Sequence, residues 1–213
     1  MSGTRLWIVI LAVATIFTSS AVAQDEKNEV GGIIGRTFIS DQGLRNLPVF
    51  DPVIHYGKGV SFEATYARRF WVTPVYSLSA EVPFMFNPDI DVNGGAYGFA
   101  VVPWGLKAFF LTPSGRVNLF PTTAVSPWVS LGAGFAHFSE SNTLVYGGKN
   151  PGSSKSSFAA QGGFGLDVKV WRNVSIRGEV RDYWSGEPDF PLANTGKTRQ
   201  HNFLVGGGAF WRF

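Results

Sequence analysis

The sequence predicts an all-β fold, an eight-stranded antiparallel up-and-down barrel, and three observations support it. Apolar and polar residues alternate with a period of two in eight segments, as they do in strands whose two faces meet different surroundings. Gly accounts for 26 of the 213 residues and aromatic residues for 15%, whereas charged residues reach only 15%, against ~25% in ordinary soluble domains. After the N-terminus, no apolar run reaches the ~20 residues of a membrane-spanning helix. A large apolar surface without long apolar runs favours strands and excludes a disordered chain.

Residues 1–23 have the order of a secretory signal. Arg5 is followed by an apolar run over residues 6–17 and by small residues at 21–23, where a signal peptidase cleaves. The run is too short to span a bilayer, so we expect cleavage, rather than an uncleaved anchor, and a mature chain of residues 24–213. Loss of Arg5 lowers the net charge by one unit from +3, and this small, scattered charge does not indicate a nucleic-acid partner.

The eight expected strands, in chain order, lie at about 29–39, 59–70, 74–86, 98–111, 126–139, 157–170, 174–185 and 201–213. In each segment one parity is apolar or aromatic and the other carries charges, Ser and Gly. The second places Phe62, Ala64 and Tyr66 opposite Ser61, Glu63, Thr65 and Arg69. The seventh places Val174, Ile176 and Val180 opposite Ser175, Arg177, Glu179 and Arg181. In the last, Leu204 and Phe210 break the alternation.

The polar face is predicted to point into the barrel and the apolar face into a membrane. Small residues crowd the polar face, as at Gly163 and Gly165, where they make room in a narrow interior. Large residues on the other face would be solvated by hydrocarbon. The few charges on that face, Arg68, His137 and Asp182, lie near strand ends, where an Arg costs only ~0–1 kcal/mol. The sequence therefore predicts a transmembrane barrel.

The connections and the aromatic residues agree with this orientation. The gaps after odd-numbered strands, about 40–58, 87–97, 140–156 and 186–200, are all long. Those after even-numbered strands are about 70–73, 112–125 and 171–173, of which only the second is long. Because outer-membrane barrels have short periplasmic turns, we expect both termini in the periplasm. Aromatic residues at strand ends, among them Phe110, Trp171, Trp184, Phe203 and Trp211, predict two girdles at the membrane surfaces.

With these features the chain resembles the small eight-stranded outer-membrane barrels of Gram-negative bacteria, the OmpA-type and opacity-type proteins. The resemblance covers the mature chain and is one of pattern. Its sharpest element is the C-terminus, where Gly208, Trp211 and Phe213 look like the signal that hands the family to the barrel-assembly machinery, although Gly206 stands where a polar residue is usual. The resemblance implies a monomer in the bacterial outer membrane, with membrane lipid, lipopolysaccharide and, during biogenesis, the assembly machinery as partners.

Ten charged residues are expected to face the lumen, either lining a conduit or forming a salt-bridged plug. They are Arg36, Glu63, Arg69, Glu81, Lys107, Asp167, Lys169, Arg177, Glu179 and Arg181. Eight strands leave an interior that side chains just fill, which favours the plug. A three-residue loop at 171–173 sets the register of the sixth and seventh strands and predicts Asp167 opposite Arg177, with Gly165 opposite Glu179.

A His-x-Ser pair, His137 and Ser139, lies on the fifth strand near the outer rim. It resembles the pair of an outer-membrane lipid A deacylase, although that family continues with Asn where this chain has Glu140. A His that activates a Ser is sound chemistry for acyl transfer. A rim histidine within an aromatic girdle is the alternative interpretation.

Metal and cofactor signals are weak. Asp89, Asp91 and Asn93 begin like a calcium loop, but its twelfth position, which should be a bidentate Glu, is Ala100, so a solvated turn is favoured. The three His residues have no metal-ligand spacing, no Cys occurs, and the Gly runs lack the strand–Gly–helix context of a phosphate loop. We expect no cofactor.

The sequence thus predicts a non-enzymatic outer-membrane protein with a structural or surface-interaction role. Its specificity would reside in four outer loops, because loops on a rigid scaffold usually carry it. Three alternatives remain at this point: a narrow porin-like conduit, a lipid A deacylase at the outer rim, and a soluble lipocalin-like carrier. The last would need the large apolar face inside and lacks the Gly-x-Trp start of that family. The sequence identifies no extracellular ligand.

Overall fold

The computed structural model describes residues 26–43, 53–57, 59–93, 103–144, 147–152, 154–188 and 199–213. Within these ranges the secondary structure is all β. The strands are β1 (Asn28–Ile39), β2 (Gln42–Gly43), β3 (Val53–Tyr56), β4 (Val60–Val72), β5 (Tyr76–Asn93), β6 (Gly105–Leu111), β7 (Ser114–Leu119), β8 (Val125–Glu140), β9 (Ser154–Lys169), β10 (Val174–Ser185) and β11 (Gln200–Arg212). In the described part of the chain, no helix is long and apolar enough to cross a membrane.

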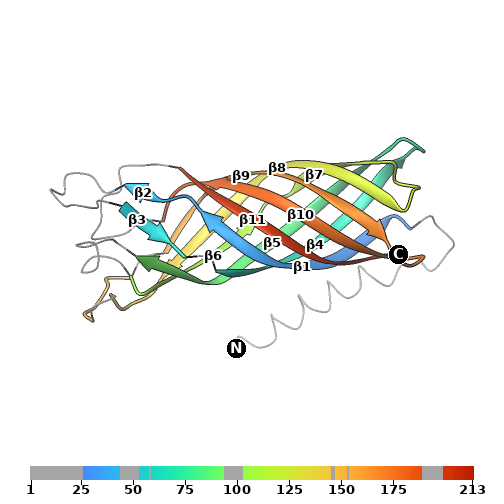
Figure 1. Ribbon diagram of the computed structural model, residues 1–213. Helices are drawn as coiled ribbons and strands as arrows, with labels where there is room; N and C mark the ends of the chain where they lie inside the picture. Colours follow the sequence, from blue (N-terminus) through green and yellow to red (C-terminus); the bar gives the residue numbers. More distant parts are fainter. Residues whose placement is uncertain are drawn as a thin grey trace, which may run out of the picture.

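The strands close into an eight-position antiparallel ring (Figure 1). Each long strand pairs with its neighbours in chain order, and β1 pairs with both β4 and β11, which closes the ring. β6 and β7 share one position, since both pair with β5 and β8. Closure matters because an open strand edge would leave backbone groups without partners in a membrane. The predicted fold class is confirmed.

The two ends of the barrel differ. We call the end that carries Asn28 and Phe213 the terminal end, and the opposite end the loop end. At the loop end β2 and β3 form a small hairpin within the first long connection (Figure 1). β3 also pairs with the last residues of β5, His55 with Asn93. β5 therefore runs to Asn93, seven residues beyond the predicted end at 86, and extends the wall of the barrel at the loop end.

The predicted long gap at 112–125 is wrong. Only Thr112 and Pro113 interrupt the fourth barrel strand, which resumes as β7 at Ser114 and ends at Leu119. Pro113 has no backbone N–H to donate, so the ladder breaks there, and its carbonyl accepts from Ala133 N at 3.2 Å. The true connection is 120–124, so all three connections at the terminal end are short. Residues 98–102 of the predicted fourth strand lie outside the described residues.

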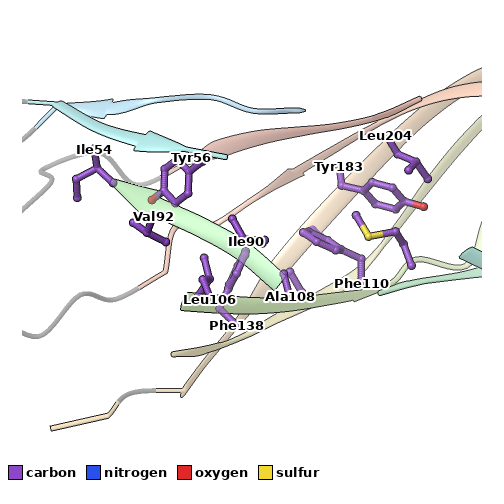
Figure 2. Packing of buried hydrophobic residues seen from close by; sticks show 13 residues of the cluster. Ile54, Tyr56, Ile90, Val92, Leu106, Ala108, Phe110, Phe138, Tyr183 and Leu204 are labelled. Carbon is purple, nitrogen blue, oxygen red and sulfur yellow. The ribbon is translucent and has the colours of Figure 1, made fainter. Parts of the chain in front are cut away.

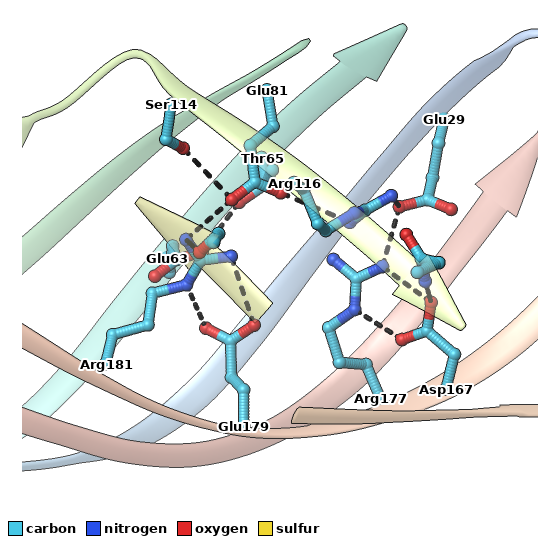
Figure 3. A network of polar contacts seen from close by, with 12 residues as sticks. Glu29, Glu63, Thr65, Glu81, Ser114, Arg116, Asp167, Arg177, Glu179 and Arg181 are labelled. Atoms are coloured by element: carbon cyan, nitrogen blue, oxygen red, sulfur yellow. Dashed lines mark hydrogen bonds and ion pairs between the residues drawn. The ribbon is translucent and has the colours of Figure 1, made fainter. Parts of the chain in front are cut away.

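Side chains alternate between a buried inward face and an exposed outward face. On β4, Ser61, Glu63 and Thr65 are buried whereas Phe62 and Tyr66 are exposed, as the period of two predicts. The lumen contains two layers. An apolar cluster, called the plug below, fills the loop-end half (Figure 2), and a network of charged side chains fills the half toward the terminal end (Figure 3).

Candidate functional site

The charged network has one centre at Arg177, which is fully buried on β10. Its Nε donates to Asp167 Oδ1 at 2.6 Å, and its Nη2 donates to Glu29 Oε1 at 2.7 Å (Figure 3). The guanidinium also lies 3.7 Å from the ring centroid of Phe210, which faces inward. Glu29 also accepts hydrogen bonds from two other arginines, Arg116 at 2.8 Å and Arg212 at 2.8 Å. Five side chains from five strands thus meet in one set of charge-assisted hydrogen bonds.

A second centre lies at Arg181, four residues along β10 toward the loop end. Its Nε donates to Glu179 Oε1 at 2.8 Å and its Nη1 to Glu81 Oε1 at 2.8 Å. Glu63 lies 3.5 Å from the same Nε and accepts a hydrogen bond from Tyr183 Oη at 2.8 Å. Glu81 also approaches Arg116 Nη1 at 3.2 Å, which joins the two centres. The network is therefore continuous across the barrel.

Trp128 packs between the two centres, with 2% of its surface exposed. Its ring centroid lies 5.1 Å from the Arg177 guanidinium and 5.0 Å from that of Arg181, within range of cation–π attraction. Gly165 makes room for the indole, because a Cβ there would come within 2.6 Å of Trp128 Cζ2. Gly163 does the same for Arg181, whose Cγ would lie 2.9 Å from such a Cβ. Gly163 and Gly165 of β9 thus leave room for the large side chains of Arg181 and Trp128.

The predicted register of the β9–β10 hairpin is confirmed. Asp167 lies opposite Arg177, Gly165 opposite Glu179, and Gly163 opposite Arg181. The three-residue loop acts as expected, with Val170 N donating to Val174 O at 3.1 Å. The sequence pattern did not identify Glu29, Arg116 and Arg212 as network members. Arg116 was missed because it lies in the segment taken for a loop.

Two of the ten expected lumen charges face outward instead. Arg36 and Lys107 are exposed, whereas their sequence neighbours Thr37 and Leu106 are buried. On β6 the inward positions are Leu106, Ala108 and Phe110, which places Lys107 on the outward parity. On β1 the inward positions are Ile33 and Thr37, which places Arg36 on the outward parity. Two others lie at the terminal mouth, Arg69 half-buried and Lys169 exposed. The remaining six, Glu63, Glu81, Asp167, Arg177, Glu179 and Arg181, are buried.

The plug closes the loop-end half of the lumen. Phe110 lies 5.0 Å from the Tyr183 ring and 5.8 Å from the Phe138 ring, measured between centroids (Figure 2). Phe110 is thus a lumen residue and not a member of the predicted girdle. The plug consists of Ile54, Tyr56, Met85, Ile90, Val92, Leu106, Ala108, Phe110, Ala136, Phe138, Ala159, Tyr183 and Leu204. At the end of the plug that is farthest from the charged network, burial raises the pKa of the Tyr56 hydroxyl, which donates to Gln42 Oε1 at 2.8 Å.

The structure does not join His137 to Ser139. His137 Nδ1 lies 2.8 Å from Ser156 Oγ on β9, and its ring packs 5.0 Å from that of Phe109. Ser139 is exposed and pairs in register with Lys107. Glu140, the next residue, points inward and accepts a hydrogen bond from Asn150. The contact between nucleophile and base that acyl transfer requires is therefore not formed by the expected pair.

Asp89, Asp91 and Asn93 lie in β5 and do not form a loop. They are exposed and alternate with the buried Ile90 and Val92, as in any half-buried strand. Alternate residues of a strand are about 7 Å apart and point the same way, so they do not wrap around an ion. The turn expected here is strand, because β3 and β6 supply pairing partners. Among the described residues, no group of three His, Cys, Asp or Glu is placed to hold a metal.

The C-terminal residues lie at the seam that closes the barrel. Trp211 is exposed on the outward face and pairs with Val30 of β1. Its ring stacks on Phe213, with centroids 4.9 Å apart. Phe213 N donates to Asn28 O at 2.9 Å, and Asn28 N donates to Phe213 O at 2.9 Å. Gly208 lies on the inward side of the same seam, opposite Ile33.

Residues 9–213 match the family profile described as the outer membrane protein beta-barrel domain. The chain belongs to this outer-membrane barrel family. Among solved structures, Neisserial surface protein A is 14% identical, with a TM-score of 0.55 over 87% of this chain and 97% of that one. OprG from Pseudomonas aeruginosa is 13% identical, with a TM-score of 0.50 over 88% and 97%. The N-terminal barrel domain of Pseudomonas aeruginosa OprF is 12% identical, with a TM-score of 0.49 over 89% and 100%.

At these identities the likeness shows the fold alone. No curated protein matches the chain. Membership of the outer-membrane family explains the outward face, where Ile34, Phe164 and Leu131 are 64%, 59% and 76% exposed. Side chains of this kind meet hydrocarbon on the outside of a membrane barrel. The predicted outer-membrane location is confirmed by the family.

Proposed function

We propose that this outer-membrane barrel is closed to solutes and has a non-enzymatic structural or surface-interaction role. One observation carries the proposal: both halves of the lumen are filled by side chains that bind one another. Arg177, Arg181 and Trp128 fill the charged half of the lumen, and the plug, which includes Phe110, fills the other half. A solute would have to separate buried ion pairs, which is strongly unfavourable because it leaves uncompensated charges.

The proposal includes an orientation, with both termini in the periplasm and the loop end outside. Its support is the length of the connections. Those at the terminal end, 73–75, 120–124 and 170–173, are short, and outer-membrane barrels place short turns in the periplasm. The long connections then face the exterior and carry whatever specificity the protein has, since loops vary while the scaffold holds them. We propose a monomer, inserted by the barrel-assembly machinery.

Planar-bilayer recordings test the closed lumen. The wild-type protein is expected to give no steady channels, because the charged network and the plug fill both halves of the lumen within the described residues. A variant with Trp128→Gly and Arg181→Gly in the charged half, and Phe110→Gly and Phe138→Gly in the plug, removes large side chains from both halves of the lumen. We expect this variant to conduct. Steady wild-type channels of the same size as those of the variant would contradict the proposal and favour the porin-like alternative.

Cysteine labelling tests the orientation. The chain contains no Cys, so single introduced thiols report without background. Lys149→Cys places an exposed thiol at the loop end, and Thr122→Cys places one in the 120–124 turn. A membrane-impermeant maleimide is expected to label the first in intact cells and the second only after permeabilisation. The reverse pattern would invert the proposed orientation and leave the closed lumen unaffected.

A further inference from the structure

A groove of about 450 Å³ lies at the loop-end rim, on the outer side of the wall formed by β5, β6 and β8. Side chains of Asp89, Trp104, Lys107 and Ser139 line it. These four residues belong neither to the charged network nor to the plug, although Leu106 of the plug and the buried Glu140 also line the groove. The groove is therefore a feature that closure of the lumen does not explain.

A β-bulge creates the groove. Asn87 pairs with Ala108 and Ile90 with Leu106, so Pro88 and Asp89 together face the single residue Lys107. Pro88 has no N–H for the ladder, and bulges of this kind re-aim side chains at sheet edges and binding sites. On its other side Lys107 pairs with Ser139. The bulge thus brings a carboxylate (Asp89), an ammonium group (Lys107) and a hydroxyl (Ser139) to the same part of the rim.

Among the polar groups of the groove, Glu140 is used by the fold, since it accepts a hydrogen bond from Asn150, whereas Asp89 and Lys107 remain available. Asp89 and Lys107 are exposed, and within the described ranges neither makes an ion pair or a side-chain hydrogen bond. Trp104 is 66% exposed, while its backbone N–H donates to Thr143 O at 2.8 Å and holds the segment in place. An exposed indole beside hydrogen-bonding groups suits a sugar ring, and a Lys ammonium suits a phosphate.

The depth of the groove indicates the source of such a ligand. Phe109 is the next outward residue on β6 after Lys107, and its ring lies 6.0 Å from that of Phe84 and 6.2 Å from that of Phe135. Rows of aromatic rings in membrane barrels lie at the membrane surface. Lys107 is two residues farther out, about 7 Å along the strand, and so lies at the level of the lipid headgroups.

We propose that this groove binds the phosphorylated amino-sugar headgroup of an outer-leaflet glycolipid. Lys107 binds a phosphate, Trp104 packs on a sugar ring, and Asp89 and Ser139 bind hydroxyl or amide groups. Asp89 repels phosphate, so the phosphate lies on the Lys107 side and the sugar on the Asp89 side. The proposal rests on the orientation proposed above, since only the outer leaflet carries this lipid.

Native mass spectrometry of the folded protein in a zwitterionic detergent tests the site. The probes are bisphosphorylated lipid A, monophosphorylated lipid A, phosphatidylglycerol and a soluble phosphorylated glucosamine disaccharide without acyl chains. We expect bisphosphorylated lipid A to be retained most strongly. Lys107→Gln should weaken this retention roughly tenfold, since it removes one charge-assisted hydrogen bond. Trp104→Ala should weaken retention of lipid A but not of phosphatidylglycerol.

Arg68→Gln is the matched control, because Arg68 is an exposed cation of the outward face near the terminal end. It should retain lipid A as the wild type does. Equal retention of lipid A by Lys107→Gln and wild type, or equal retention of phosphatidylglycerol and lipid A, overturns the site. Binding of the soluble disaccharide that Lys107→Gln weakens supports the headgroup assignment, and failure of the disaccharide to bind at any concentration overturns that assignment. Failure of the orientation is detected separately by the cysteine labels, and loss of an acyl chain from bound lipid A would contradict only the non-enzymatic role.

Discussion

Replacement of Arg177 by Met is expected to lower the free energy of unfolding by roughly 3–5 kcal/mol. The side chain is fully buried and holds Asp167 and Glu29 by hydrogen bonds of 2.6 and 2.7 Å. Met keeps much of the volume but removes the charge, so two buried carboxylates, Asp167 and Glu29, lose a partner. Repulsion between them is then balanced only by Arg116 and Arg212, which still contact Glu29.

Reversible urea unfolding in detergent, followed by tryptophan fluorescence, measures this effect. Arg68→Met is the matched control, because Arg68 is exposed on the outward face, and we expect a change within about 0.5 kcal/mol. The double variant Arg177→Met with Asp167→Asn should be less destabilised than the sum of the single variants, because each removes the partner of the other. Strict additivity would mean that the two residues are not coupled.

An exchange of charges between Asp167 and Arg177 should recover little stability. From the sequence alone the two residues form an isolated pair, for which reversal of both charges restores the attraction. In the structure Arg177 also binds Glu29, and Asp167 lies 3.4 Å from Arg212 Nη2. The exchanged pair would place like charges at both of these contacts. The larger network was not visible in the sequence because it joins residues more than 140 positions apart, such as Glu29 and Arg177.

Local rules account for what the sequence predicted well. A period of two places Glu63 inward and Phe62 outward without knowledge of any neighbour. A three-residue loop sets the register of Asp167 and Arg177, because the pairing of a short hairpin follows from its turn. These features depend on residues close in the chain, and one sequence contains all the information they need.

The features that the sequence predicted poorly depend on pairing and packing with other strands. Thr112 and Pro113 are typical of a loop, yet β5 and β8 offer pairing on both sides, so the strand resumes at Ser114. Lys107 faces outward because its neighbours Leu106, Ala108 and Phe110 pack into the plug, and a single strand does not reveal which of its two faces is enclosed. The groove at the rim depends on the offset between β5 and β6, which no single segment encodes.

Replacement of Gly208 by Val is expected to prevent closure of the barrel. Gly208 lies on β11 at the seam with β1, where a Cβ would overlap the carbonyl oxygen of Gly32 and come within 2.9 Å of Ile33 Cα. These are backbone atoms, so the neighbour has no rotamer that relieves the clash. Overpacking usually costs ~1–3 kcal/mol, and a clash with the backbone of a closing strand pair should exceed this range. The variant is expected to lose the compact form that migrates faster on a gel without heating.

Gly178→Val on β10 is the matched control, since Gly178 is exposed on the outward face and a Cβ there meets no atom within 4 Å. This variant should fold like the wild type, because a β-branched residue suits an exposed strand position in lipid. Refolding in detergent without assembly machinery separates the steric effect from the role of Gly208 in the predicted C-terminal signal. We expect Gly208→Val to fail in the purified system as well as in cells. Normal refolding in detergent, with failure only in cells, would assign Gly208 to recognition by the machinery and not to closure of the seam.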